Sequence, residues 1–234
     1  GKLGILIPGL SGAVSTTFLT GVIAARRGLG EPFGSLTQMG TIRLGKRTEG
    51  RSPLIRDFVP LAPLKDLVFG GWDIADEHCH DAALRAGVLH PDLLAPMKKD
   101  LAAIRPMKAV FDTYYVKRLK GSHIKKAKTK FDLMEAIRKD IRDFRKKNRA
   151  DRCVMIWCGS TEIFIPIGEV HSTGKKFVEG MKKNHRDISP SMLYAYASVM
   201  EGVPFANGAP NLSADVQAII ELAKQNGVAI SGKD

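Results

Sequence analysis

The chain has 234 residues, of which 44% are hydrophobic, a balance that excludes a disordered or membrane-embedded protein. Its formal net charge of +12 at pH 7 favours anionic partners such as phosphorylated metabolites, nucleic acid or acidic membrane surfaces. No stretch approaches the roughly 18 to 20 apolar residues of a membrane helix. Three cysteines, Cys79, Cys153 and Cys158, are too few and too scattered for a disulfide framework or a zinc site. Without a signal-peptide pattern at the N-terminus, we expect a cytoplasmic protein with no membrane partner.

Strands and helices alternate along the predicted chain, with one irregular insertion. In chain order the pattern predicts strand 2–7, helix 13–27, the insertion 31–63, strand 66–69, helices 74–86 and 91–104, strand 109–111, helix 131–145, strand 152–158, helix 189–201, strand 203–206, helix 212–225 and strand 228–230. Ser189 is a candidate N-cap, with Pro190 at the first helical position. The insertion is rich in Gly, Pro, Ser, Thr and Arg, and long segments of this kind are often functional.

This alternation predicts an α/β fold with a Rossmann-like, doubly wound, mostly parallel sheet. Small and polar residues gather where the predicted strands end, at residues 9–12, 70–73, 158–161, 207–211 and 231–234. In an open α/β sheet the ligand lies outside the carboxyl ends of the strands. Five clusters on one edge therefore predict a ligand site there.

The first cluster joins a strand to a helix. Phosphate binding needs free backbone N–H groups at a helix N-terminus and glycines that allow close approach, and Gly9 and Gly12 fit that need. The turn lacks the third glycine of the common dinucleotide pattern, so a plain glycine turn remains an alternative. Residues 157–162 and 207–211 are also small enough for a flat ring or a pyrophosphate, or they are two ordinary strand-to-helix turns.

Two acids are candidates for binding the ribose of a dinucleotide. Glu31 lies about 20 residues past the glycines, as the simple spacing rule asks. Asp73 ends the next clear strand and is preferred, because Glu31 precedes a proline in the irregular insertion. Asp73 is also a candidate helix N-cap, alone or in addition to ribose binding.

Two further features receive weaker functional interpretations. Residues 117–149 are densely basic, which suggests nucleic acid, but the helical part keeps an apolar face and has no interleaved aromatic residues. A solvated charged face is therefore the preferred interpretation. His78 and His80 suggest a metal, but we expect residues two apart on a helix to face different ways, and no metal site is predicted.

Six stretches, taken together and in order, resemble the inositol-phosphate synthases. They are residues 9–17, 34–47, 70–74, 157–162, 204–211 and 231–234. The first two resemble the bacterial type, and Gly70-Gly71-Trp72-Asp73-Ile74 matches the second signature of the family. Residues 157–162 stand where eukaryotic members have Trp-Thr-Ala-Asn-Thr-Glu, and residues 204–211 resemble the Asn-Gly-Ser-Pro signature. Two departures stand out: Ser11 lengthens the glycine turn, and Lys233 stands where eukaryotic members have an acid.

The resemblance implies a bound NAD that is used and restored in each turnover. A hydroxyl of glucose 6-phosphate would be oxidised, and enolisation, intramolecular aldol closure and reduction would then give 1L-myo-inositol 1-phosphate, for inositol and phospholipid biosynthesis. The family's cofactor contacts map onto Gly9, Leu10, Ser11, Gly12, Ala13 and Val14 at the phosphates, Asp73 at the ribose, Cys158, Gly159, Ser160 and Thr161 along the dinucleotide, and Gly208, Ala209 and Asp234 near the nicotinamide.

The resemblance also implies an incomplete enzyme. Residues 1–230 would form the NAD-binding domain, and residues 231–234 would begin the family's second α+β domain for catalysis and oligomerisation. The lysines that hold the substrate phosphate and drive enolisation are expected downstream of Asp234, so no catalytic residue is assigned. A homo-oligomer, dimer or tetramer, is expected at full length. The alternatives are a non-catalytic NAD-binding relative and, less favoured, a basic nucleic-acid-binding protein.

Overall fold

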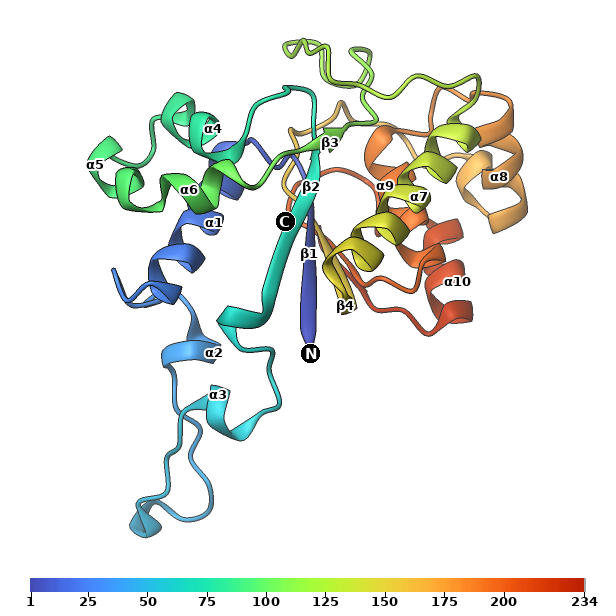
Figure 1. The fold of residues 1–234 in the computed structure, drawn as a ribbon. Helices are drawn as coiled ribbons and strands as arrows, with labels where there is room; N and C mark the ends of the chain where they lie inside the picture. The colour runs from blue at the N-terminus through green and yellow to red at the C-terminus, as the bar shows by residue number, and fades with distance from the viewer. Residues whose placement is uncertain (234) are drawn as a thin grey trace.

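A computed structural model describes residues 1–233, and its six strands form one parallel sheet (Figure 1). The strands are β1 (Lys2–Pro8), β2 (Leu67–Asp73), β3 (Met107–Lys108), β4 (Ala150–Trp157), β5 (Phe205–Asn207) and β6 (Ile230–Ser231). Their order is β3-β2-β1-β4-β5-β6, so the chain reverses its direction of winding between β1 and β4. The predicted doubly wound α/β fold is confirmed, and the sheet is parallel throughout. None of the helices within residues 1–233 is long and apolar enough to cross a bilayer.

Helices cover both faces of the sheet (Figure 1). They are α1 (Ala13–Arg26), α2 (Leu36–Met39), α3 (Ile55–Phe58), α4 (Cys79–Ala86), α5 (Pro91–Leu94), α6 (Lys98–Ala102), α7 (Lys130–Asn148), α8 (Gly174–Lys182), α9 (Pro190–Met200) and α10 (Gln217–Asn226), with 3-10 turns η1 (Arg47–Glu49), η2 (Leu64–Asp66), η3 (Ala95–Met97) and η4 (Glu169–His171). Alternate residues of β1 serve the two faces, since Ile5 and Ile7 pack with α1 and α4 whereas Leu6 joins the core under α7 and α9.

Several element boundaries differ from the prediction for identifiable reasons. The helix predicted at 74–86 begins only at Cys79, because His78 accepts the Asp81 N–H and caps it. Pro96 lacks an N–H, and the helix predicted at 91–104 is broken there into α5, η3 and α6. The strand predicted at 66–69 runs on to Asp73.

Three further differences lie in the second half of the chain and at β3. The short strand predicted at 109–111 forms two residues earlier, as β3. The helix predicted at 212–225 begins at Gln217, because a buried loop precedes it in which the Asn207 side chain donates to Asn211 O at 2.7 Å. Helix α8 has no counterpart in the prediction. Its Thr173 N-cap accepts the Lys176 N–H, so an N-cap signal was present.

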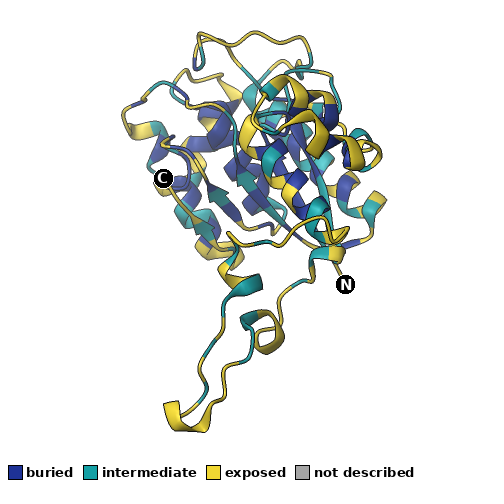
Figure 2. Ribbon diagram, turned by 90° about the vertical axis from the view of Figure 1, so that its left-hand side faces the viewer, coloured by how far each residue is buried: buried dark blue, intermediate teal, exposed yellow. Residues whose placement is uncertain are grey.

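The irregular insertion at residues 31–63 forms an arm that projects from the end of the sheet where β1 begins (Figures 1 and 2). Its two sides pair with each other through an antiparallel bridge between Thr41 and Leu54 and a hydrogen bond from Leu44 N to Arg51 O at 2.9 Å. None of residues 31–63 is buried, as the yellow and teal colouring in Figure 2 shows. The arm therefore adds little to the core.

Candidate functional site

The carboxyl edge of the sheet holds a cavity of about 420 Å³ beside the point where the winding reverses. Three of the five predicted clusters meet there, those at residues 9–12, 70–73 and 158–161. The lining residues are Pro8, Gly9, Ser11, Gly12, Trp72, Asp73, Ile74, Ala75, Arg85, Ala109, Val110, Phe111, Val116, Leu119, Lys120, Trp157, Cys158, Gly159, Ser160, Glu162, Pro190 and Tyr194. This is where an open α/β sheet binds its ligand.

Glycine is required at position 9 because two turns touch there. Gly9 has φ +89°, and a Cβ at this position would lie 2.6 Å from both Cys158 O and Gly159 N. The same contact is fixed by a hydrogen bond from Cys158 N to Pro8 O at 3.0 Å. The turn after β1 is thus packed directly against the turn after β4.

Most amides of the glycine turn are already used within the protein. Gly9 N and Leu10 N both donate to Trp72 O, at 2.8 and 3.1 Å, and Gly12 N donates to Gly9 O at 3.1 Å. The first amides of α1 remain, because a helix offers them no internal acceptor and the Gly12 N-cap has no side chain to cap them. Ala13 and Val14 therefore provide the donors that an anion can reach.

Two buried polar atoms of the cavity lining lack a partner. Ser11 Oγ and Trp157 Nε1 make no hydrogen bond to any described residue, although both are buried. Buried polar groups are normally paired, and leaving one unpaired costs roughly 1–3 kcal/mol. A polar ligand in the cavity could form hydrogen bonds with these two atoms. The lining therefore suits a ligand such as a dinucleotide.

Asp73 joins the glycine turn to the end of β2. Its Oδ2 accepts from Ser11 N at 2.9 Å, and its Oδ1 accepts from Ala75 N at 3.3 Å. A carboxylate oxygen that accepts one N–H keeps a further lone pair, so Asp73 can still accept from a ribose hydroxyl. Its alternative role as a helix N-cap is wrong, since His78 caps α4. Glu31, the other candidate, lies in the arm outside the cavity lining.

The turn after β4 contributes Cys158, Gly159 and Ser160 to the lining, whereas Thr161 is exposed outside it. Burial raises the pKa of the Cys158 thiol, and a hydrogen bond with Ser15 opposes that shift. The thiol is therefore protonated at neutral pH and is a packing group rather than a nucleophile.

Several other predicted contact residues lie outside the lining. The Leu10 side chain is fully buried in the core, and Ala13 and Val14 lie exposed at the start of α1. Gly208 N donates to Trp157 O at 3.1 Å, where a Cβ would lie 2.8 Å from that oxygen. Ala209 is buried beside it. Asp234 lies outside the described residues.

One wall of the cavity was absent from the sequence prediction. It is the strap, residues 109–128, which connects β3 to α7 and crosses the carboxyl edge (Figure 1, upper part). Within the strap, Ala109 N donates to His123 O at 3.0 Å and Lys125 N donates to Ala109 O at 2.7 Å. An ion pair from Lys125 Nζ to Asp140 Oδ2 at 2.7 Å holds the strap against α7. The same Asp140 oxygen accepts from Trp72 Nε1 at 2.6 Å. Lys120 gives this wall a positive charge.

Tyr194 of α9 forms the floor between the two tryptophans. Its ring lies edge-on to Trp72 and Trp157, with centroid distances of 5.1 and 5.6 Å. Its hydroxyl accepts from Val110 N at 2.9 Å and so ties the floor to the strap. Nothing in the sequence singles out this tyrosine from others on an apolar helix.

Glu162 is a buried carboxylate at the N-terminus of α9. It accepts from Ser191 N at 2.9 Å and from Ser191 Oγ at 2.6 Å. Burial raises its pKa, and these hydrogen bonds oppose the shift. Ser189 is the N-cap residue as predicted, although its side chain makes no capping bond to the backbone.

Part of the basic stretch forms ion pairs with acids of the same molecule. On α7, Arg138 and Arg142 both bind Glu201 Oε1, at 2.7 and 2.6 Å, and Lys139 binds Asp143. The opposite face of α7 is buried through Met134, Ile137, Ile141 and Phe144. This arrangement suits a solvated, ion-paired helix face.

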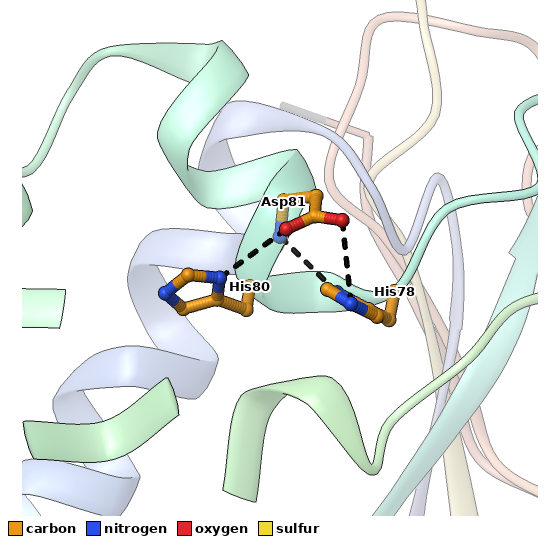
Figure 3. Close-up of side chains that lie close together, drawn as sticks. All are labelled: His78, His80 and Asp81. Atoms are coloured by element: carbon orange, nitrogen blue, oxygen red, sulfur yellow. Dashed lines mark hydrogen bonds and ion pairs between the residues drawn. The ribbon is translucent and has the colours of Figure 1, made fainter. Parts of the chain in front are cut away.

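One geometric expectation is corrected. His78 lies before α4, not within it, so His78 and His80 do not point apart as residues two apart on a helix would. Their ring centroids are 6.1 Å from each other, and both contact Asp81 (Figure 3).

A family model described as Myo-inositol-1-phosphate synthase, an NAD-binding family, matches residues 3–234. The chain belongs to the myo-inositol-1-phosphate synthase family. The family resemblance of the six sequence stretches is confirmed by this match. It is also consistent with the site, because the family model is that of an NAD-binding domain and the cavity lies where such domains bind dinucleotides.

Relatives of known name agree with this assignment. Inositol-3-phosphate synthase 1 of Bacteroides thetaiotaomicron is 48% identical over 235 residues, covering 100% of this chain and 54% of the relative. Inositol-3-phosphate synthase isozyme 1 of Arabidopsis thaliana is 36% identical, covering 100% of this chain and 48% of the relative. The chain therefore spans about half the length of the curated relatives it matches.

Solved structures give the same picture. Inositol-3-phosphate synthase from Caenorhabditis elegans superposes with a TM-score of 0.91 at 27% identity, covering 100% of this chain and 49% of that one. A myo-inositol-1-phosphate synthase-related protein from Thermotoga maritima superposes with a TM-score of 0.69 at 18% identity, which supports the fold alone.

Proposed function

We propose that this chain is the NAD-binding part of an inositol-phosphate synthase that converts glucose 6-phosphate to 1L-myo-inositol 1-phosphate. NAD supplies a reversible hydride acceptor, so the complete reaction is an isomerisation without net redox change. Because the chain spans about half of its relatives, catalysis is assigned to a longer protein. The phosphorylated substrate is consistent with the net charge of +12.

The observation that carries this proposal is the matched set of unused donors at the carboxyl edge. The first amides of α1, Ser11 Oγ and Trp157 Nε1 have no partner among the described residues, and all belong to turns at one cavity or directly beside it. A pyrophosphate at the α1 N-terminus would accept from these amides and gain from the helix dipole.

The other contacts follow from the order of the strands along the carboxyl edge of the sheet. With the pyrophosphate at Gly12 to Val14, Asp73 lies on the β2 side and binds the adenosine ribose, and the strap covers the adenine. On the other side, Cys158, Gly159, Ser160 and Thr161 lie along the dinucleotide. Gly208 and Ala209 flank the nicotinamide end, where Asp234 would also act, and Leu10 contributes by packing the turn from below.

The domain organisation follows the same logic. We assign residues 1–230 to the NAD-binding domain and residues 231–234 to the start of the second domain. That domain would supply the lysines for phosphate binding and enolisation and the contacts of a homo-oligomer. A cytoplasmic location is proposed with it.

The first test measures NAD binding by intrinsic fluorescence. Trp72 and Trp157 are the two tryptophans of the sequence and both line the cavity, so NAD should quench the emission. Ala13→Pro removes one free amide at the first helical position, where proline is tolerated, and Gly12 already has the extended conformation that precedes proline. The expected loss of affinity is about tenfold or more, from one charge-assisted hydrogen bond.

Ala13→Ser is the matched control, because it keeps the amide, and its NAD affinity should stay near that of the parent. Equal affinity for Ala13→Pro and Ala13→Ser would contradict the assigned pyrophosphate position. Absence of quenching at any NAD concentration that saturates related enzymes would contradict NAD binding itself.

The second test addresses the reaction. The protein extended to the length of its relatives is incubated with NAD and glucose 6-phosphate, and products are followed by phosphorus NMR while NADH absorbance is recorded. An inositol monophosphate without NADH accumulation is expected. Accumulating NADH would indicate an ordinary sugar-phosphate dehydrogenase, and NAD binding without any product would indicate a non-catalytic relative.

A further inference from the structure

The start of α4 brings together two imidazoles and a carboxylate, from His78, His80 and Asp81 (Figure 3). His78 Nε2 lies 3.3 Å from Asp81 Oδ2, and His80 Nδ1 lies 3.3 Å from Asp81 Oδ1. One ligand atom from each of the three residues lies within 4.8 Å of the other two. The two rings thus approach the same carboxylate.

The local backbone explains this convergence. His78 is the N-cap of α4 and has the extended conformation φ −77°, ψ 159°, which turns its side chain back over the first helical turn. There His78 Nδ1 accepts from Asp81 N at 3.3 Å, which leaves Nε2 facing the carboxylate. His80 reaches the same carboxylate from within the first turn.

Burial holds the rings in place and leaves an entrance. The exposed fractions of the side chains are 8% for His80, 19% for His78 and 58% for Asp81. Arg85, the nearest cation along the helix, is occupied by Glu77, with Nε to Oε1 at 2.8 Å. The open carboxylate side can therefore admit a cation from solvent.

We propose that His78, His80 and Asp81 bind a borderline transition-metal ion, with Zn²⁺ as the representative case. Ligands at roughly 2.0–2.1 Å from a tetrahedral zinc ion lie about 3.3–3.4 Å from one another. Each imidazole nitrogen already lies 3.3 Å from one oxygen of Asp81, His78 Nε2 from Oδ2 and His80 Nδ1 from Oδ1. A rotation of the exposed Asp81 side chain would bring one oxygen to both nitrogens, since the three ligand atoms lie within 4.8 Å of one another. Imidazole nitrogens suit zinc, nickel or copper and do not suit magnesium or calcium. Three protein ligands leave one position for water.

Metal binding has a defined structural cost. An imidazole that binds metal through Nε2 carries its proton on Nδ1, so His78 would no longer accept the Asp81 N–H. The ion and the cap compete for the same ring. Because Ile74 and Ala75 of the cavity lining precede His78 by a few residues, the ion would also fix the connection between β2 and α4.

The experiment is isothermal titration of the tag-free protein with ZnCl₂, NiCl₂ and MgCl₂, using His78→Ser, Asp81→Asn and a control. Serine keeps the N-cap, so His78→Ser removes the ligand without removing the cap. His90→Ser is the matched control, because His90 caps α5, accepts from Asp92 N at 3.3 Å and lies 3.3 Å from Asp92 Oδ2. A Cys158→Ser background excludes binding by the cavity thiol.

The expected result is one zinc or nickel ion per chain and no magnesium binding. Affinity should fall at least about tenfold in His78→Ser and in Asp81→Asn, and it should be unchanged in His90→Ser. Thermal unfolding checks the same site, since saturating zinc should raise the midpoint of the parent and not that of His78→Ser. No zinc binding by the parent, or equal loss in His78→Ser and His90→Ser, would overturn the proposal.

Discussion

Strand β1 and the arm lie close in sequence but differ in how they are held. Five of the seven residues of β1 are buried, whereas none of residues 31–63 is. Strand β1 forms hydrogen bonds with β2 and β4, while the arm is bridged to itself through Thr41 and Leu54. The contrast teaches that the cavity is built on the part of the molecule with the densest packing, which is what a precise binding site requires.

The largest effect is expected from the centre of the sheet. Leu6 is fully buried in β1, and Leu6→Ala should lower the free energy of unfolding by about 2–5 kcal/mol, through lost burial and the cavity that remains. Urea unfolding followed by circular dichroism measures this change. A loss below 1 kcal/mol would mean that β1 is not the packing centre described here.

The next largest loss of stability is expected in the turn that follows β1. Gly9→Ala forces a side chain onto a positive φ and into contact with Cys158 O and Gly159 N, so it should cost clearly more than the roughly 1–2 kcal/mol of the left-handed backbone alone. Gly28→Ala is the matched control, with φ +66° and nothing within 4 Å of the new Cβ. Equal destabilisation of the two variants would show that the turns after β1 and β4 do not press together.

A smaller effect should appear as a pH dependence at Lys130. Its Nζ donates to Tyr115 OH, His185 O and Ile188 O, and burial lowers its pKa from 10.5 to about 8. Between these values the unfolded chain binds a proton that the folded protein releases, so this lysine makes stability rise with pH across that window. The urea midpoint of the parent should therefore rise relative to that of Lys130→Met as the pH increases through this window. A pH-independent difference would contradict the lowered pKa.

The smallest effect is expected from the arm. Phe33 is 79% exposed, and Phe33→Ser should change the free energy of unfolding of this chain by no more than about 0.5 kcal/mol. The same urea titration used for Leu6→Ala measures it. A loss comparable to that of Leu6→Ala would remove the distinction between the arm and the sheet.

The sequence predicted the parts of the site that depend on local patterns. Glycine turns after apolar strands placed Gly9, Gly12, Asp73 and Cys158 at one edge, because parallel strands end on the same side. The resemblance to the family then indicated which part of NAD each turn would contact. Hydrophobic periodicity predicted which segments form strands and helices. It missed boundaries that are set by a side-chain cap, such as the start of α4 after His78.

The sequence did not predict the features that depend on contacts between distant segments. The strap has no periodic pattern, and its position is set by the pairing of Lys125 with Asp140 and of Tyr194 with Val110. The hydrogen bonds from Gly9 N and Leu10 N to Trp72 O are also contacts between distant segments. Because these two amides are occupied, the free donors are the first amides of α1. The His78 and His80 rings meet because of one cap, which a helical spacing rule cannot represent.

The strand order has a consequence for how the protein is made. Leu3 pairs with Leu67 on one side and with Arg152 on the other, so β1, which precedes the other described strands in the chain, lies inside the sheet between β2 and β4. Its second neighbour, β4, begins only at Ala150, so it leaves the ribosome long after β1 and β2. Until then β1 has an unpaired apolar edge, and contacts of such long sequence separation form slowly. The nascent chain is therefore most exposed to aggregation before β4 emerges, and protection by a chaperone would matter most during that interval.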